Sequence, residues 1–433
     1  MMARADLNVF IEGRLVGVVD GANPSSLRFR YDDRWAADPD STPLSVSMPL
    51  AVEDHTHRVV HSFLWGLLPD NDRVLARWAS DFQCSATDVI ALLSNVGAEV
   101  AGAAQYLPIG EDPDEAGPGA VVALTEADVA QRLRAVRRDT TAWHAARTSG
   151  RWSLAGAQGK IVLHRDADSG VWGEPSGATP TTHILKPAIG GMDDHDLNEH
   201  LCLEVARGLG LTVARTEMVQ FDDERALVVR RYDRVPRDGR VLRVHQEDFC
   251  QALSIHPAHK YENEGGPSVA DMVKVVRNTE PGDPTRDVGA VCQAVAFNWL
   301  ILGTDAHAKN YSLLLSGAQV RLAPLYDIAS ALPYGDHPSK LRLAQKVGGT
   351  YRPDIIARRH WERLAAACGT NPDELISDIH TMIDRTPDVL SDTIRNASLT
   401  EDEGSAAGKL LDRLSTWLTS CRRSLESGAD TTN

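Results

Sequence analysis

Alternating and periodic apolar positions divide the chain into a mixed N-terminal part and a mainly helical C-terminal part. Over residues 7–20 they alternate around Glu12-Gly13-Arg14, which predicts a hairpin. The other predicted elements are a strand over 27–31, a short extended piece over 43–50, a helical region from 63 past 78, a helix over 88–93 and a closing strand over 102–107. These elements predict a small mixed domain over residues 1–110.

A connector is predicted to follow, because residues 110–119 consist mostly of glycine, proline and acidic residues. Thr125 and Asp128 then have the spacing of a helix-capping box, which predicts a polar helix over 125–138. Residues 111–145 are therefore a connector with one helix.

The middle of the chain, residues 146–237, is predicted to be mixed. A strand is expected to end near Lys186, and a second strand over 226–234 becomes polar at its end. Between them, Asn198 and Glu199 open a predicted helix whose apolar positions repeat with a helical period and which ends near Gly208.

The remaining residues, 238–433, predict a mainly helical lobe. Residues 291–302 are apolar almost all round, which indicates a buried helix. Two strands are expected around Ser316-Gly317-Ala318, and amphipathic helices over 353–424. The last residues, 426–433, are expected to be disordered.

Composition is that of a globular protein, with 42% hydrophobic and 24% charged residues. A formal charge of −15 argues against a broad nucleic-acid-binding face on this chain, but it suits a basic partner. No signal peptide and no transmembrane segment are expected, which predicts a cytoplasmic protein. The six cysteines contain no Cys-x-x-Cys pair and are expected to be reduced core residues.

The candidate chemistry lies in Asp305, Asn310 and Asp327. Protein kinases use a catalytic Asp followed five residues later by a metal-binding Asn, and a later Asp that also binds the metal. Asp305 and Asn310 have that spacing, and Asp327 has the right distance for the later acid. The alternative is that Asp305 and Asn310 only shape a turn. The predicted buried helix before them and hairpin after them favour catalysis.

Two other segments suit nucleotide binding. The small residues of Ser153 to Leu163 would let backbone N–H groups approach phosphates, although a plain turn also fits this motif. Lys186 ends an apolar strand, as does the kinase lysine that contacts phosphates, and Glu199 is its candidate partner. A solvated helical glutamate is the alternative for Glu199.

In this order the motifs resemble the HipA family of bacterial serine/threonine kinase toxins, over nearly the whole chain. The motifs that carry the resemblance are Met48-Pro49-Leu50, Leu67-Leu68-Pro69-Asp70, Ser153 through Lys160, Thr182 through Pro187, His245 through Gln251, Lys260-Tyr261-Glu262, Gly265 through Ser268, Asp305 through Asn310 and Tyr326-Asp327. The resemblance implies an α+β, two-lobed protein-kinase-like fold. In that fold, residues 1–110 are the N-terminal subdomain, 146–237 the nucleotide-binding part and 238–433 the catalytic lobe.

The resemblance also implies a role for each site residue. Asp305 is the catalytic base, and Asn310 and Asp327 bind Mg²⁺. Lys186 contacts the ATP phosphates, and the backbone from Arg230 to Tyr232 meets adenine. The other residues expected to line the nucleotide or metal site are Ser153, Gln158, Gln246, His307, Lys309 and Tyr326. Ser153 is in addition the expected autophosphorylation site, where a phosphate would eject the loop that covers the nucleotide.

The sequence departs from the family pattern at two positions. Arg230 stands where the pattern often has Glu, and Gly159 replaces the usual acid before Lys160. Structural roles remain open for His307, as a loop histidine, and for Gln246, as a packing or capping residue. For Ser153 the residues alone favour a surface serine in a loop, and only the resemblance favours the autophosphorylation site.

The resemblance implies a kinase that transfers the ATP γ-phosphoryl group to a protein serine or threonine, for example on an aminoacyl-tRNA synthetase. It also implies a HipB-like DNA-binding antitoxin as partner, so that DNA is contacted only through that partner. One alternative is a non-catalytic, nucleotide-binding corepressor. A second is a small-molecule kinase of the aminoglycoside type, which shares the Asp-to-Asn spacing.

Overall fold

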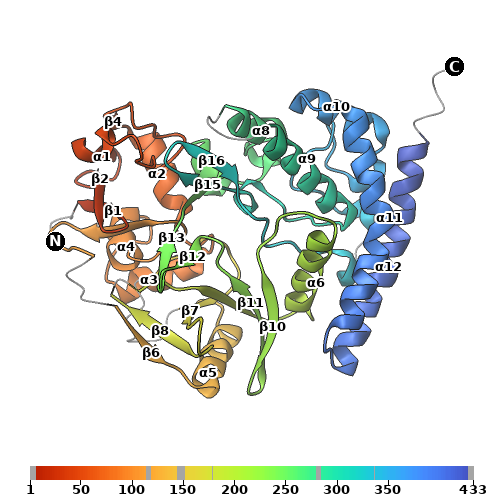
Figure 1. The fold of residues 1–433 in the computed structure, drawn as a ribbon, viewed down its shortest axis with the longest axis horizontal. Coiled ribbons are helices and arrows are strands. Elements are labelled where there is room, and N and C mark those ends of the chain that lie inside the picture. Colours follow the sequence, from red (N-terminus) through yellow and green to blue (C-terminus); the bar gives the residue numbers. More distant parts are fainter. Residues whose placement is uncertain are drawn as a thin grey trace. The chain divides into compact units, whose positions relative to one another are not determined.

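The computed structural model describes residues 6–113, 119–143, 152–177, 179–278, 284–335 and 337–427 (Figure 1). Part of the predicted connector and most of the predicted disordered tail lie outside these residues. The chain forms two compact units. The first comprises Met1–Pro187, Val219–Ala258 and Leu313–Val320, and the second comprises Ala188–Met218, His259–Ser312 and Arg321–Asn433. The domain boundaries inferred from sequence stay predictions.

The first unit begins with a five-stranded sheet in the order β4-β3-β2-β1-β5. Its strands are β1 (Leu7–Ile11), β2 (Arg14–Asp20), β3 (Arg28–Tyr31), β4 (Asp54–His55) and β5 (Ala104–Pro108). The predicted hairpin is confirmed: Ile11 pairs with Arg14, and Glu12 and Gly13 have φ of 48° and 73°. Positive φ at both central residues is the geometry of a type I′ turn, which matches the twist of the strands.

Four helices accompany this sheet: α1 (Asp33–Ala37), α2 (His57–Gly66), α3 (Asp72–Asp81) and α4 (Val89–Val96). They contribute Phe63, Trp78 and Leu92 to a core shared with the strands. The predicted extended piece over 43–50 is wrong. It forms a turn in which the Met48 N–H donates to the Ser45 carbonyl at 2.9 Å, since Pro43 and Pro49 cannot donate to a sheet ladder.

A six-stranded sheet in the order β10-β11-β9-β7-β8-β6 forms the middle of the first unit. Its strands are β6 (Ala120–Ala123), β7 (Ile161–Arg165), β8 (Trp172–Ser176), β9 (His183–Pro187), β10 (Thr216–Phe221) and β11 (Glu224–Arg230). Helix α5 (Glu126–Arg138) packs on this sheet through Val129 and Leu133. The predicted capping box is confirmed: the Thr125 hydroxyl accepts from the Asp128 N–H, and the Asp128 carboxylate accepts from the Thr125 N–H.

Shorter elements complete the first unit. They are the hairpin β12 (Arg234–Arg237) and β13 (Arg240–Arg243), strand β14 (His245–Asp248) and helix α7 (Phe249–Ala252). Strand β14 pairs with β15 (Ser312–Ser316), which pairs with β16 (Gln319–Leu322). The strands β15 and β16 confirm the hairpin predicted around Gly317.

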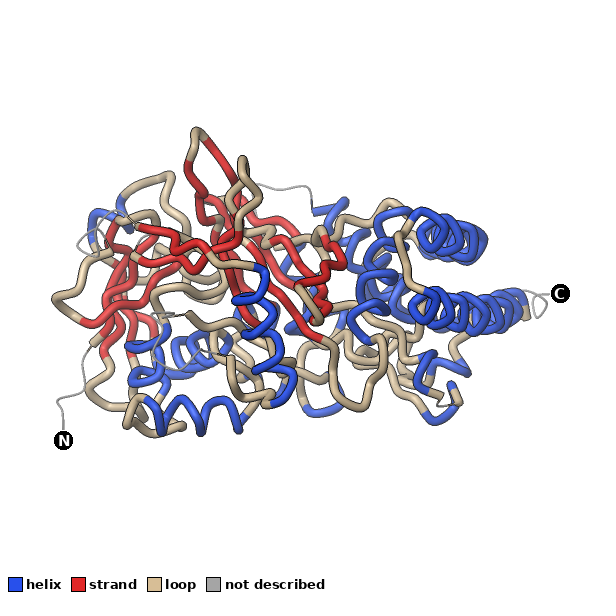
Figure 2. Tube along the Cα trace, turned by 90° about the horizontal axis from the view of Figure 1, so that it is seen from below, coloured by secondary structure: helices blue, strands red, loops and turns tan. Residues whose placement is uncertain are grey.

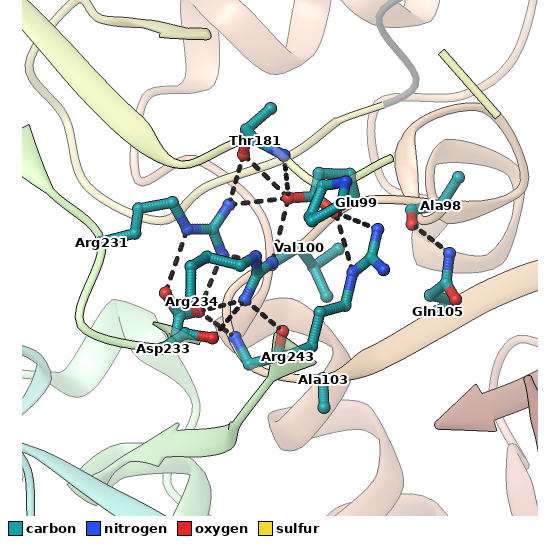
Figure 3. A network of polar contacts seen from close by, with 12 residues as sticks. Ala98, Glu99, Val100, Ala103, Gln105, Thr181, Arg231, Asp233, Arg234 and Arg243 are labelled. Atoms are coloured by element: carbon teal, nitrogen blue, oxygen red, sulfur yellow. Dashed lines mark hydrogen bonds and ion pairs between the residues drawn. The ribbon is translucent and has the colours of Figure 1, made fainter. Parts of the chain in front are cut away.

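A buried ionic network ties the N-terminal sheet domain to the end of strand β11 (Figure 3). The Glu99 carboxylate accepts from Arg231 and Arg234, each at 3.0 Å, and from Arg243 at 2.9 Å. The Asp233 carboxylate accepts from Arg231 and Arg234 at 2.8 Å. Although burial opposes ionisation, the charges of the three arginines lower the pKa of the Glu99 carboxyl well below its usual range.

The second unit is mainly helical (Figure 2). Its α-helices are α6 (His195–Gly208), α8 (Val269–Arg277), α9 (Pro284–Leu300), α10 (Arg358–Cys368), α11 (Pro372–Asn396) and α12 (Glu401–Glu426). Short 3₁₀ segments lie at Glu262–Glu264, Ala308–Asn310, Leu332–Tyr334, Pro338–Lys340 and Pro353–Ile355. Another, Pro257–His259, contains the point in the chain where the first unit ends and the second resumes. Sheets in the first unit and helices in the second confirm the predicted α+β class.

Three tryptophans form the centre of this helical unit. The Trp299 ring lies 5.3 Å from that of Trp361 and 6.4 Å from that of Trp417. The Trp417 indole N–H donates to the Trp299 carbonyl at 3.1 Å. Trp299 belongs to α9, which is therefore the buried helix that the apolar run over 291–302 predicted.

Helices α11 and α12 are the longest of those described, and charged residues occur along both. No described helix meets the length and hydropathy expected of a membrane span.

Candidate active site

The candidate catalytic loop begins where α9 ends. The Gly303 N–H donates to the Asn298 carbonyl at 2.7 Å, and Leu302 has a φ of 57°. A side chain at Gly303 would approach the Asn298 Oδ1 atom to 2.5 Å, so any larger residue there would have to displace the Asn298 side chain. The chain therefore turns sharply at the end of a buried helix, which fixes where the loop starts. Leu302 has left-handed backbone, and strained backbone of this kind often occurs at functional sites.

Asp305 is the single acid between Gly303 and Asn310. Its side chain is 70% exposed, and one carboxylate oxygen accepts a hydrogen bond from the Tyr261 hydroxyl. The His307 Nε2 atom lies 3.9 Å from that same oxygen. The His307 ring is buried and stands perpendicular to the Tyr261 ring, with 4.9 Å between centroids. An accessible carboxylate held by a phenol is well placed to accept a proton from a substrate hydroxyl.

Asn310 is oriented by the loop itself. Its Nδ2 atom donates to the Asp305 carbonyl at 2.8 Å, which fixes the direction of the amide. Since the donor end is used within the loop, the Oδ1 end is the part of this side chain that could serve as an oxygen ligand. The spacing of five residues therefore has a structural meaning, because the two residues close one turn.

Tyr326 brings the segment that contains Asp327 to this loop. Its hydroxyl donates to the Lys309 carbonyl at 2.7 Å and lies 2.7 Å from the Ser312 hydroxyl. Asp327 follows directly, is exposed, and has a φ of 57°. Left-handed backbone at a non-glycine residue costs about 1–2 kcal/mol, so surrounding contacts must hold Asp327 in place.

The donor set suits Mg²⁺. An amide oxygen from Asn310 and a carboxylate from Asp327 are hard oxygen ligands, and Mg²⁺ commonly uses one or two such groups together with phosphate oxygens and water. Among the described residues there is no group of three or more His, Cys, Asp or Glu side chains placed to hold a metal ion.

The nucleotide-binding candidates of the first unit lie on the six-stranded sheet and just after it. Lys186 is buried on β9, the strand between β11 and β7. Arg230 is exposed at the end of β11, opposite His183. The structure brings two other candidates together, because the Tyr232 hydroxyl donates to the Gln246 side-chain oxygen.

Glu199, the candidate partner of Lys186, is 1% exposed on α6. This burial excludes the alternative of a solvated helical glutamate. Its pairing with Lys186 stays a prediction. Helix α6 starts at His195, three residues before the predicted start.

The loop from Ser153 to Lys160 is held by hydrogen bonds of its side chains to backbone carbonyls. Ser153 is fully buried, and its hydroxyl donates to the Leu67 carbonyl at 2.7 Å. The Lys160 ammonium donates to the Ala155 carbonyl at 2.6 Å, and Gly156 has a φ of 103°. Gln158 is half-buried on this loop. The structure therefore replaces the surface-serine alternative for Ser153 with an internal position.

Two contacts were not predicted from the sequence. One is the hydrogen bond from Tyr261 to Asp305. The family motif Lys260-Tyr261-Glu262 pointed to this segment, but no role was predicted for Tyr261. The other is the ionic network around Glu99, for which the run Arg230-Arg231-Tyr232-Asp233-Arg234 was the available signal.

Comparison with known proteins identifies the family of the chain. The profile of the HipA N-terminal domain matches residues 7–107, and that of the HipA-like C-terminal domain matches residues 152–390. The chain is 35% identical over 396 residues to Y4mE of Sinorhizobium fredii, a protein named provisionally as a kinase. That match covers 90% of this chain and 92% of the relative.

Two further similarities concern Shewanella oneidensis. The chain is 29% identical over 379 residues to its serine/threonine-protein kinase toxin HipA, covering 84% of each chain. A solved complex of HipA, HipB and operator DNA from this organism contains a chain that superposes with a TM-score of 0.85 at 25% identity, covering 99% of this chain and 100% of that one.

These similarities place the chain among kinase-like proteins with an α+β fold. It belongs to the HipA family, whose members include serine/threonine kinase toxins.

Proposed function

We propose that the protein transfers the γ-phosphoryl group of ATP to a serine or threonine hydroxyl of a protein substrate. The observation that carries this proposal is the geometry of one loop: the exposed Asp305 carboxylate is held by Tyr261, and the Asn310 amide is fixed by the Asp305 backbone. A base and a metal ligand held rigidly in one turn are what phosphoryl transfer requires.

In this proposal Asp305 accepts the proton of the substrate hydroxyl and orients its oxygen for attack. Tyr261 keeps the carboxylate in place by donating its hydroxyl hydrogen, and the His307 Nε2 atom lies 3.9 Å from the same carboxylate oxygen. Asn310 and Asp327 would hold Mg²⁺, which when bound would neutralise charge on the phosphates. The hydrogen bond from the Asn310 amide to the Asp305 carbonyl supports this role, because a ligand ordered in advance costs less to bring to the metal.

Lys186 contacts the phosphates of ATP in this proposal. The backbone from Arg230 to Tyr232 meets adenine, and the hydrogen bond from the Arg231 N–H to the Thr182 carbonyl, at 3.0 Å, holds this segment beside β9. Because backbone groups make these contacts, Arg230 in place of an acid has little effect. Gln158, Gln246, His307, Lys309 and Tyr326 complete the lining of the nucleotide or metal site.

Regulation through Ser153 is the second part of the proposal. A phosphate adds nearly two negative charges, and burying them at the Leu67 carbonyl would be strongly unfavourable. Autophosphorylation of Ser153 would therefore expel the loop and weaken ATP binding. Phosphorylation itself requires that Ser153 first leave its buried position.

The partner is proposed to be a small, basic, HipB-like antitoxin that binds DNA. The solved Shewanella complex contains HipB and operator DNA, and the charge of −15 on this chain suits a basic partner. The proposed protein substrate is of the aminoacyl-tRNA synthetase class, and the proposed location is the cytoplasm.

Incubation with labelled ATP and cell lysate tests this function. Label on protein serine or threonine, lost in Asp305→Asn, is the expected result. Label on small molecules would replace the proposal with a small-molecule kinase. Absence of any transfer by a chain that still binds ATP would indicate a non-catalytic corepressor.

A further inference from the structure

Asn198 of α6 uses both ends of its side-chain amide on one residue of the segment that follows Asp327. The Asn198 Nδ2 atom donates to the Ser330 carbonyl at 2.7 Å, and the Oδ1 atom accepts from the Ser330 N–H at 3.1 Å. Asn198 is 5% exposed and Ser330 is 2% exposed. A buried amide that pairs with both backbone groups of one residue fixes the position and the direction of that residue. None of the roles proposed above uses Asn198.

Ser330 is also held by the end of α9, from which the candidate catalytic loop starts. Its hydroxyl donates to the Ile301 carbonyl at 2.6 Å, and the Ala331 N–H donates to the Leu302 carbonyl at 3.1 Å. Helix α6, the end of α9 and the segment after Asp327 therefore meet at Ser330.

The chain is held before Asp327 as well. Leu325 forms a parallel bridge with Val213, and its carbonyl accepts from the Ala214 N–H at 2.8 Å. Contacts at Leu325 and Ser330 thus bracket Asp327, whose backbone is left-handed with a φ of 57°. Because such backbone is strained at a residue other than glycine, it persists only where neighbouring contacts determine the path of the chain.

We propose that Asn198 is a positioning residue that acts through Asp327: by fixing Ser330, it holds the Asp327 carboxylate in place to bind Mg²⁺. This inference rests on the proposed function, in which Asp327 is a metal ligand. Loss of the Asn198 amide would leave the buried N–H and carbonyl of Ser330 without partners, which is costly. The segment would then relax, and Asp327 would leave its strained conformation.

Calorimetry of ATP binding to the full-length protein, over a series of Mg²⁺ concentrations, tests this role. Asn198→Leu keeps the size of the side chain but removes both hydrogen bonds. It should need about tenfold more Mg²⁺ than the wild type for the same ATP affinity, because groups that orient metal ligands typically contribute about 10–100-fold to metal affinity. ATP affinity without Mg²⁺ should not change. The same Mg²⁺ dependence in the variant and the wild type would overturn the proposal.

Two further variants separate positioning from a general loss of structure. Asp327→Asn already weakens the metal ligand, so adding Asn198→Leu should not change the Mg²⁺ dependence further; an additional loss would show that Asn198 does not act through Asp327. His200→Ala is the matched control, because it removes a hydrogen bond between the same helix and the Thr216 hydroxyl. It should keep the wild-type Mg²⁺ dependence, and a shift as large as that of Asn198→Leu would overturn the proposal.

Hydrogen exchange without any ligand gives a second readout, which applies even if Asn198→Leu does not fold. The smaller change Asn198→Ala should make exchange of the Ser330 amide faster than in the wild type, and unchanged exchange would overturn the proposal. A wild type that binds no ATP at any Mg²⁺ concentration would instead overturn the proposed function. ATP binding that Asn198→Leu leaves unchanged would overturn only the role of Asn198.

Discussion

Replacing Glu99 by Gln removes one of two carboxylates that balance three buried guanidinium groups. The Glu99 carboxylate accepts from Arg231, Arg234 and Arg243 and also from the Thr181 hydroxyl at 2.8 Å. An amide of the same shape keeps one acceptor oxygen, but it turns an N–H₂ group toward guanidinium donors. Only one carboxylate would then remain among the three arginines.

The magnitude follows from burial. Side chains of Arg231 and Arg234 expose 2% and 1% of their surface, so water cannot replace the lost charge. Removal of one partner from a buried ionic network typically costs about 3–5 kcal/mol. A typical domain has about 5–15 kcal/mol of total stability, so Glu99→Gln should markedly destabilise the first unit.

Urea unfolding followed by tryptophan fluorescence measures this cost, since Trp152 forms a β-bridge with Glu99 and Trp143 stacks on Trp152 in the same core. The control is Asp38→Asn, which breaks an exposed ion pair with Arg14 in the same unit and should leave the transition unchanged. Equal midpoints for Glu99→Gln and the wild type would refute the reasoning.

The same network predicts a dependence on pH. The folded-state pKa of Glu99 is depressed, so its stabilising contribution is fully present above the unfolded pKa of about 4.3 and is lost as pH falls below that value. Glu99→Gln should remove this part of the acid dependence.

Three other changes have clear expected outcomes. Tyr261→Phe should lower the turnover number about fivefold, because a hydrogen bond to the catalytic carboxylate contributes about 1 kcal/mol. Stability should not change, since Asp305 is exposed. An unchanged turnover number would exclude this positioning role. Burial raises the pKa of Glu247 to about 8 in the folded protein, whereas the unfolded chain ionises at about 4.3. The free energy of unfolding should therefore fall as pH rises from about 4.3 to 8, and Glu247→Gln should flatten this part of its pH dependence in urea unfolding. Lys186→Ala should weaken ATP binding about tenfold or more by calorimetry, whereas the exposed Lys340→Ala should not; equal affinities would contradict the phosphate contact.

Local elements could be predicted from the sequence because their causes are local. Gly13 permits the tight turn between β1 and β2, and the Thr125–Asp128 spacing sets the start of α5. The Asp305–Asn310 spacing also has a local cause, since the Asn310 amide bonds to the Asp305 carbonyl.

Other features depend on contacts between residues far apart in the chain. Tyr261 and Asp305 are 44 positions apart, and Arg231 and Glu99 are 132 apart. Neither hydrophobic periodicity nor motif spacing contains that information. The start of α6 was predicted too late although Asp194, a residue type that often precedes a helix, stands directly before it; in the structure Asp194 has left-handed backbone and makes no side-chain cap bond.

The most direct test of the central claim compares phosphorylation by the wild type and by Asp305→Asn in the same lysate with labelled ATP, after ATP binding by both has been shown to be equal. Removal of a general base typically costs a factor of about 10²–10⁴ in rate, so the variant should lose nearly all transfer to protein serine and threonine. The same phosphosites, labelled at the same rate by both proteins, would contradict the assignment of Asp305 as the base.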